Sequence, residues 1–138
     1  SNNEIIVYGK LPLMTTSLCP VGIYSAEKSN EKYCKKRFQN NNYYLVDRKN
    51  ITFPITTNCH QCFSEIFNSS TIFMLDKFED LEKMKVGFFR LEFLDEDLND
   101  IREVIKAYTS LEKTNAIKVK QEIFKYGITH GHFYRGVL

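Results

Sequence analysis

The chain has 138 residues, of which 43% are hydrophobic and 26% charged, a composition typical of one ordinary globular domain. Its formal net charge of +2 is too small to indicate a protein that binds nucleic acid or membranes, and no apolar run approaches the length of a transmembrane helix. No signal peptide is visible, so we expect a cytoplasmic protein. Residues 1–2 resemble the scar of a cleaved tag, which predicts a piece cut from a longer protein.

The first part of the chain predicts one strand followed by irregular segments. Glu4–Tyr8 is β-branched and aromatic and ends at Gly9, which predicts a buried strand. Pro12 excludes a central strand just after it. Thr15–Asn42 has no clean periodicity, and Cys19–Gly22 within it is interpreted as a turn.

A β-hairpin is expected next. Tyr43–Val46 and Ile51–Ile55 are short strand-like runs, and Asp47–Asn50 between them has the composition of a closing turn. Pro54 predicts that the second run is an edge strand. Cys59 and Cys62 follow directly, in a turn of the kind that presents sulfur to a metal ion.

The second half is more regular. Thr71–Leu75 predicts a buried strand, and Asp76 with Glu79 three residues later predicts a capping box. The helix that follows is expected to end near Gly87 and to bury three apolar side chains: Phe78, Leu81 and Met84.

Another strand and helix are predicted after Gly87. Phe88–Leu94 has the pattern of a strand, and the acidic run Asp95–Asp97 suits the positive end of a helix. One face of that helix would carry Leu98, Ile101, Val104, Ile105, Tyr108 and Leu111.

The alternation of strand and helix predicts an α/β fold with parallel pairing and right-handed crossovers. We expect a single domain in four parts. Residues 1–2 are the scar, 3–70 form a strand with Cys-rich loops and the hairpin, 71–113 form two β-α units, and the glycine-containing residues 114–138 form a docked tail.

The four cysteines are the most informative side chains. Cys59 and Cys62 form a Cys-x-x-Cys step, and Cys19 and Cys34 could complete a four-sulfur site for zinc or an iron–sulfur cluster. Free structural thiols are the next interpretation. Two disulfides are the third, because nothing indicates an oxidising compartment.

Nucleophilic catalysis has weaker candidates. A Ser-His-Asp triad would need Ser64 or Ser69, a histidine (His60 or His132) and Asp47, but no Gly-x-Ser-x-Gly elbow surrounds either serine. A cysteine nucleophile would pair Cys19 or Cys62 with one of the same two histidines.

Some charged residues and a histidine pair are further candidates. Arg90 and Glu92 alternate with apolar neighbours and would lie on an active-site floor or form a mutual salt bridge. His130 and His132 could bind a metal ion if that segment is extended. Arg135 could hold a phosphate or carboxylate, although an ion pair is the alternative.

Four stretches of the chain resemble the collagenase-like peptidase family, peptidase family U32. They are Tyr8–Met14 with Ser17–Pro20, Tyr43–Arg48 with Phe53–Ile55, Cys62 with Ile66–Ser69, and Thr129–Val137. Their order matches the C-terminal part of the family's conserved domain. The chain departs from many relatives at Pro12, where they have a cysteine.

The resemblance implies the last strands of a TIM-type barrel, with the Cys-rich loop and hairpin as an insertion. It also implies a peptidase of unassigned catalytic type, whose weak catalytic candidates here are Arg90, Glu92, His132 and Arg135. Similar proteins hydroxylate tRNA, ribosomal RNA or quinone precursors without oxygen, using an iron–sulfur cluster on four cysteines. This pattern places the cluster ligands at Cys19, Cys34, Cys59 and Cys62.

We therefore expect a segment of a U32-type peptidase whose cysteines hold a metal ion or cluster. The alternatives are an iron–sulfur hydroxylation factor and a non-catalytic structural or interaction domain. A peptide, protein or RNA substrate is expected for the full-length protein. The isolated piece is expected to be inactive, and the absence of a bound metal in it is an open alternative. Uncovered strand edges predict self-association.

Overall fold

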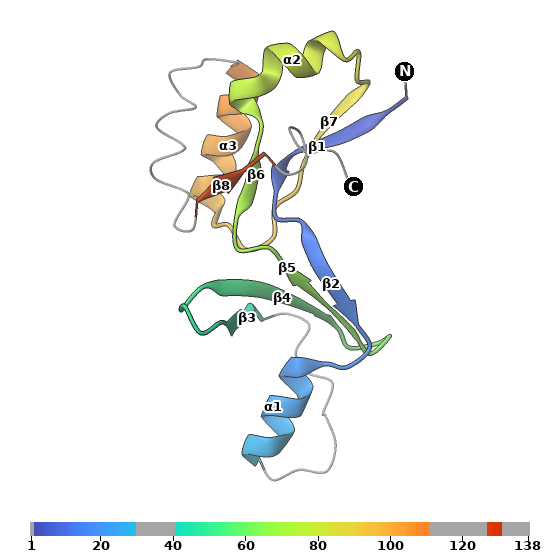
Figure 1. Cartoon of the computed structure of the whole chain (residues 1–138), viewed down its shortest axis with the longest axis vertical. Coiled ribbons are helices and arrows are strands. Elements are labelled where there is room, and N and C mark those ends of the chain that lie inside the picture. Colours follow the sequence, from blue (N-terminus) through green and yellow to red (C-terminus); the bar gives the residue numbers. More distant parts are fainter. Residues whose placement is uncertain (1, 30–40, 111–126, 131–138) are drawn as a thin grey trace. The chain divides into compact units, whose positions relative to one another are not determined.

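The structure is a computed structural model that describes residues 2–29, 41–110 and 127–130. Within these ranges the fold is mixed α/β, with two four-stranded sheets and no closed barrel (Figure 1). The chain divides into two compact units. We call Pro12–Ser69 the cysteine unit, and the remainder, up to Leu11 and from Ser70, the α3 unit.

The sheet of the α3 unit has the strand order β7-β1-β6-β8. Its strands are β1 (Glu4–Gly9), β6 (Thr71–Phe73), β7 (Phe88–Leu91) and β8 (Ile128–Thr129). The sequence predicted that β6 and β7, which are joined by a helix, pair in parallel. This prediction is wrong, because β1 lies between them and is parallel to β7 but antiparallel to β6.

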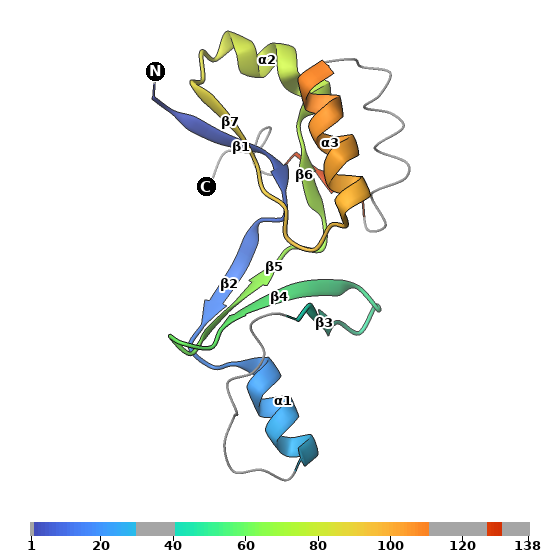
Figure 2. The ribbon, with the colours of Figure 1, turned by 180° about the vertical axis from the view of Figure 1, so that it is seen from behind.

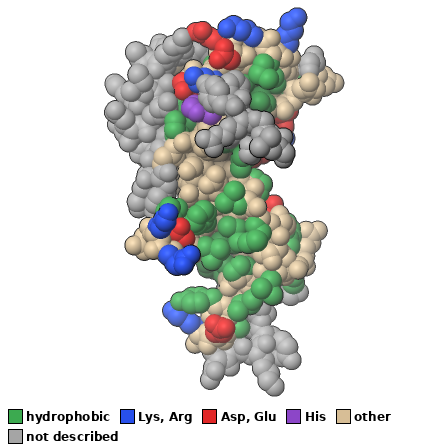
Figure 3. Space-filling view, viewed as in Figure 1, with side chains coloured by type: hydrophobic (Ala, Val, Ile, Leu, Met, Phe, Trp, Pro, Cys, Tyr) green, Lys and Arg blue, Asp and Glu red, His purple; other side chains and the backbone are tan. Residues whose placement is uncertain are grey.

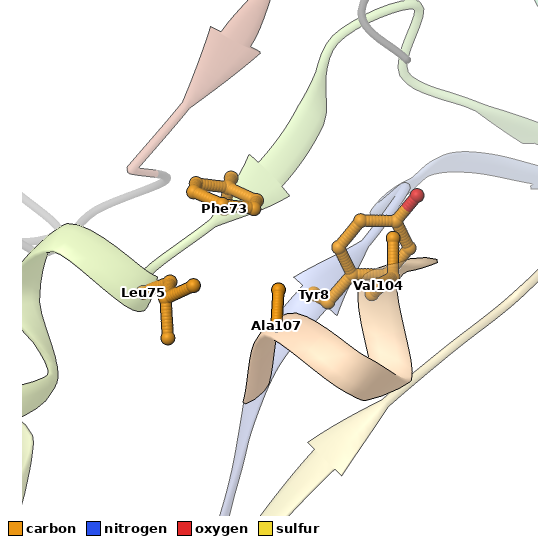
Figure 4. Close-up of a cluster of buried hydrophobic side chains, with 5 residues drawn as sticks. All are labelled: Tyr8, Phe73, Leu75, Val104 and Ala107. Atoms are coloured by element: carbon orange, nitrogen blue, oxygen red, sulfur yellow. The ribbon is translucent and has the colours of Figure 1, made fainter. Parts of the chain in front are cut away.

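Both faces of β1 are covered, which explains its β-branched and aromatic composition. Tyr8 and Phe73 pack with Val104 and Ala107 of α3 (Leu98–Ser110), as Figure 4 shows. The neighbouring positions Val7 and Ile72 pack instead with Leu81. This alternation follows from the two-residue period of a strand.

Helix α2 is shorter than the sequence pattern predicts. A 3-10 turn, η1 (Leu75–Lys77), precedes α2 (Phe78–Lys83), and no side chain caps either start. The predicted capping box is therefore wrong, because the Asp76 carboxylate contacts His130 instead. Leu81 is buried as expected, but Met84 lies just beyond the helix and is exposed.

Helix α3 confirms the strongest helical pattern in the sequence. Asp97 Oδ1 accepts hydrogen bonds from the backbone of Asn99 and Asp100, which stabilises the helix start. Val104 is buried as predicted, but Leu98 and Ile105 are exposed. Ala107 takes a core position instead, because its small side chain allows a close approach to the sheet. Leu111 lies outside the described residues.

The sheet of the cysteine unit is antiparallel with the order β2-β5-β4-β3. Its strands are β2 (Pro12–Thr16), β3 (Tyr43–Val46), β4 (Thr52–Asn58) and β5 (Phe63–Phe67). Val21 of helix α1 (Pro20–Ser29) packs on Ile55 and Ile66. Figure 2 shows this sheet and helix from behind. Pro12 begins an edge strand, which agrees with the exclusion of a central strand at this position.

The hairpin of β3 and β4 confirms its prediction. Asp47 Oδ1 accepts hydrogen bonds from the backbone N–H groups of Lys49 and Ile51, at 2.7 and 2.9 Å, and Asn50 has a positive φ of 59°. The edge assignment from Pro54 is wrong, because β4 lies between β5 and β3. Pro54 lies opposite Tyr44 of β3, whereas the ladder from β4 to β5 begins only at Ile55.

Helix α1 overturns the interpretation of Cys19–Gly22 as a turn. Pro20 is the first residue of this helix. The backbone N–H of that position has no partner within a helix, so a proline can stand there, and the fixed φ of proline suits a helix. The weak apolar periodicity of this helix explains why the sequence pattern concealed it.

The cysteine unit exposes many apolar side chains. They include Leu13, Met14, Leu18, Tyr24 and Val46, and Figure 3 shows a hydrophobic patch over the strands of this unit. Every residue of β2 from Pro12 to Thr15 is exposed. These features agree with the predicted self-association, which stays a prediction.

Candidate metal centre

Cys19 lies between β2 and α1, where it caps the helix. Its carbonyl oxygen accepts a hydrogen bond from Ile23 N at 3.1 Å, and its Sγ accepts one from Gly22 N at 3.3 Å. The side chain is partly buried and packs on the apolar cluster of Val21, Ile55 and Ile66.

Cys59 and Cys62 lie in the tight turn between β4 and β5. Asn58 Oδ1 accepts hydrogen bonds from the backbone of His60 and Gln61, at 3.1 and 3.0 Å. Cys62 has a φ of +53°, and its Sγ lies 3.9 Å from the carbonyl oxygen of Cys59. These hydrogen bonds to Asn58 stabilise the turn, and Cys62 is exposed at the end of the turn.

Strand pairing brings these two segments to one end of the sheet. Ser64 lies opposite Thr16 on β2 and opposite Thr57 on β4. Cys19 follows Thr16 by three residues, and Cys62 precedes Ser64 by two. The segment that follows β2 and the turn between β4 and β5 therefore lie at the same end of the sheet, as Figures 1 and 2 show.

The described residues do not form a complete metal site. Among them, no group of three or more His, Cys, Asp or Glu side chains could hold a metal ion. Cys19, Cys59 and Cys62 are all free thiols, and Cys34 lies outside the described residues. The donor chemistry fits a thiolate-bound zinc ion or iron–sulfur cluster, but three sulfurs do not enclose it by themselves.

Ser64 is a buried group at this end of the sheet that sequence reasoning used only as a weak nucleophile. Its side chain is fully buried, and its Oγ has no hydrogen-bond partner among the described residues. Ser64 and Ile66 alternate with half-buried residues along β5. A hydroxyl at an inward position of a strand was the signal that could have identified it.

The remaining triad candidates lie in separate settings. The carboxylate of Asp47 accepts backbone hydrogen bonds within the β3–β4 turn, and His60 is exposed in the β4–β5 turn. Ser69 is half-buried after β5, while His132 is outside the described residues. The structure therefore shows no contact that links these side chains within its described part.

Arg90 and Glu92 form an exposed ion pair at 3.1 Å, and Arg90 also pairs with Glu4. The hydrogen bond to Glu92, followed by the negative charge of Glu4, raises the pKa of Arg90 further above its already high ordinary value. His130 Nε2 lies 3.2 Å from Asp76 Oδ2, which gives this histidine a carboxylate partner. Arg135 lies outside the described residues.

A second polar cluster lies in the α3 unit, beyond β1. Lys10 forms an ion pair with Asp95, and both side chains are largely buried. Tyr8 donates a hydrogen bond to Glu96 Oε1 at 3.2 Å, while Glu96 Oε2 accepts one from Leu94 N at 2.7 Å. Sequence reasoning missed this cluster, because its members are far apart in the chain. Each named charge has a partner, which is typical of a structural network.

Comparison with known proteins found no matching family model, no matching curated protein and no matching solved structure. In the described part of the chain, no helix has both the length and the apolar character needed to cross a membrane.

Proposed function

We propose that the cysteine unit holds a thiolate-bound metal ion or iron–sulfur cluster through Cys19, Cys34, Cys59 and Cys62. The supporting observation is that the segments carrying Cys19 and the Cys59–Cys62 step leave the sheet at the same end. Cys34 is assigned from the sequence resemblance and completes the set of four.

We propose further that the chain is a segment of a U32-type protein, with a peptide or protein as its substrate. The support is the four sequence stretches that resemble the family, together with parallel pairing of β1 and β7 beside helix α3. The same proposal makes the α3 unit the last part of a TIM-type barrel. Antiparallel β6 is a departure from such a barrel, in which all strands are parallel.

The chain's own residues would have two tasks in such a site. Gly22 N–H would stabilise negative charge on Cys19 Sγ, and Asn58 would fix the turn that spaces Cys59 and Cys62. A bound zinc ion would contribute folding energy, whereas a cluster would supply redox chemistry or substrate activation. No described side chain supports a particular proteolytic mechanism.

Metal analysis of the protein purified without oxygen tests the proposal. We expect bound zinc, or iron with sulfide and visible colour, and we expect loss of the metal in each of four variants: Cys19→Ser, Cys34→Ser, Cys59→Ser and Cys62→Ser. Thr109→Ser is a suitable control, because the Thr109 hydroxyl donates to the backbone carbonyl oxygens of Ile105 and Lys106 within α3, in the other unit of the chain. A wild-type protein with no metal and four reactive thiols would contradict the proposal.

The second candidate is a non-catalytic interaction domain with inert thiols. It is favoured by the absence of a three-member metal-binding group among the described residues and by the exposed apolar side chains of the cysteine unit. It predicts that all four Cys→Ser variants keep the melting temperature of the wild type.

A further inference from the structure

Cys59 and Cys62 stand at the two ends of the turn between β4 and β5. The last paired residues of the two strands are Asn58 and Phe63, and residues 59–62 form the turn that joins them. The cysteines are therefore the first positions beyond the ladder on either side. The Cα atoms at the ends of a four-residue turn lie within about 7 Å of each other, and disulfides span about 4.4–6.8 Å. The backbone of this turn thus suits a disulfide.

The side chain of Cys62 points across this turn. Its Sγ lies 3.9 Å from the carbonyl oxygen of Cys59, so the sulfur already contacts the residue that carries the second thiol. Both sulfurs are free thiols, and Cys62 is exposed while Cys59 is half-buried. A bond between the two sulfurs therefore requires side-chain rotation within a turn that is already closed, and Cys62 is open to reagents in solution.

Polar groups other than the sulfurs hold the turn closed. Asn58 Oδ1 accepts the backbone N–H groups of His60 and Gln61, at 3.1 and 3.0 Å, and Asn58 Nδ2 donates to Gln61 Oε1 at 3.1 Å. Cys62 has a φ of +53°, a value that is uncommon for residues other than glycine. The turn is thus formed while both thiols are reduced. Two groups that are held together in this way react with each other more readily than with separate molecules.

Cys19 is placed differently from these two thiols. It lies after β2, its Sγ accepts a hydrogen bond from Gly22 N at 3.3 Å, and its side chain packs on the apolar cluster that contains Ile66. Access of a reagent to the sulfur is one determinant of how fast a thiol reacts. Oxidation should therefore select the pair in the β4–β5 turn.

We propose that Cys59 and Cys62 are a site of reversible oxidation, at which the two thiols form an intramolecular disulfide by exchange with a small-molecule disulfide. Exposed disulfides are more easily reduced than buried ones, which makes the reaction reversible. This inference does not require a bound metal. A sulfur in a disulfide is no longer a thiolate ligand, so oxidation of the pair and the proposed metal binding exclude each other.

Oxidised glutathione is a suitable reagent, and its reaction has two steps. Cys62 Sγ attacks one sulfur of the glutathione disulfide, whose S–S bond breaks, and the first glutathione leaves as a thiol with the proton of Cys62. Cys59 Sγ then attacks the sulfur of Cys62 in the mixed disulfide, and the second glutathione leaves with the proton of Cys59. The cysteines together lose two electrons and two protons, which reduce the glutathione disulfide to two thiols.

Mass spectrometry of the chelator-treated wild-type protein tests this reaction. The protein is equilibrated without oxygen at a series of ratios of oxidised to reduced glutathione, the exchange is stopped with acid, and free thiols are alkylated. Cleavage after lysine and arginine gives one peptide, residues 50–77, that holds Cys59 and Cys62 and no other cysteine. This peptide should pass from two alkylated thiols to an internal disulfide as the ratio rises, and should return to two thiols when the ratio is lowered.

Two variants separate the roles of the two thiols. Cys59→Ser should lose the internal disulfide and accumulate a mixed disulfide of Cys62 with glutathione, because the thiol that expels the second glutathione is missing. Cys62→Ser should also lose the internal disulfide but take up glutathione more slowly, because Cys59 is less exposed. Thr109→Ser, in the α3 unit, is the control and should form the disulfide as the wild type does.

The outcomes distinguish this inference from the proposed metal centre. A wild-type peptide 50–77 that keeps both thiols, or only takes up glutathione, at every ratio overturns the inference, whatever metal analysis shows. A disulfide that joins this peptide to Cys19 or Cys34 overturns it as well. An internal disulfide that forms and is reduced again supports it, even if the protein binds no metal. The decisive result comes from the wild type, so a variant that fails to fold does not affect it.

Discussion

The phenolic oxygen of Tyr108 joins two strands of the α3 unit by two hydrogen bonds. Its O–H donates to the carbonyl oxygen of Val7 at 2.6 Å, and its oxygen accepts from Met74 N at 3.1 Å. Val7 lies on β1, and Met74 directly follows β6. Met74 N also donates to Val7 O at 3.0 Å, so the phenol of Tyr108 gives each of these two backbone groups a second hydrogen bond.

Tyr108→Phe should destabilise the protein by about 1 kcal/mol, because it removes both hydrogen bonds of the phenol, while Met74 N and Val7 O keep the hydrogen bond between them. Urea denaturation measures this change in the free energy of unfolding. Tyr24→Phe is the control, because Tyr24 is 60% exposed, and it should change stability by less than about 0.5 kcal/mol. Equal stabilities of the two variants would contradict this account.

Gly9→Ala should be destabilising for two reasons. Gly9 has a φ of +136°, and an added Cβ would lie 2.6 Å from the backbone oxygen of Glu92. We expect a loss of about 2 kcal/mol or more, measured by urea denaturation.

Gly127→Ala separates the cost of backbone strain from the cost of a steric clash. Gly127 also has a positive φ, of +86°, but a Cβ there would meet nothing within 4 Å. Its substitution should cost only about 1 kcal/mol of conformational strain. A larger loss at Gly127 than at Gly9 would show that the contact with Glu92 does not matter.

The stability of the protein should fall above about pH 10, where tyrosines in the unfolded chain lose their protons. Burial, followed by the neighbouring Glu96, raises the pKa of Tyr8 well above its ordinary value, and burial also raises the pKa of Tyr108. The folded protein therefore retains protons that the unfolded chain releases, so this stability is complete below the unfolded pKa and declines as the pH rises. Each tyrosine should add a slope of about 1.4 kcal/mol per pH unit.

Urea denaturation between about pH 8 and pH 11 measures this slope. Tyr8→Phe should reduce it, while the exposed-residue variant Tyr24→Phe should leave it as in the wild type. A Tyr8→Phe protein with the full alkaline slope would show that Tyr8 is ionised as readily in the folded state as in the unfolded chain.

Asn58→Ala should lower stability by about 1 kcal/mol and weaken metal binding, because Asn58 Oδ1 accepts two backbone N–H groups in the Cys59–Cys62 turn. Thermal melting and zinc competition measure the two effects. Asn58→Asp retains the acceptor oxygen and should preserve the turn. The prediction fails if Asp and Ala at this position give the same affinity.

Local patterns predicted local structure in this chain. The hairpin was recognisable because Asp47 and Asn50 have the turn chemistry that the structure uses, and α3 was recognisable because Val104 and Tyr108 repeat at helical spacing. Helix α1 was missed because its apolar residues have little periodicity, although Pro20 at its first position was a usable signal.

Features that depend on distant partners could not be predicted. The position of β1 between β6 and β7 is set by packing on both faces of Val7 and Tyr8, which no local pattern encodes. Asp76 precedes α3 in the chain and His130 follows it, and the carboxylate of Asp76 contacts His130 instead of capping the helix α2 as predicted. For the candidate site, the sequence identified the cysteines and offered Ser64 only as a weak nucleophile, because the burial of Ser64 depends on the pairing of β5 with β2 and β4.

The pairing of Gly9 with Ile72 has a consequence for the architecture of the gene product. The chain leaves the α3 unit after Leu11, two residues beyond Gly9, and re-enters it at Ser70, two residues before Ile72, so the exit and entry points follow and precede neighbours on adjacent antiparallel strands. A short reverse turn could join them directly. The cysteine unit could therefore be deleted, or replaced by another insertion, while the β1–β6 ladder of the α3 unit is kept.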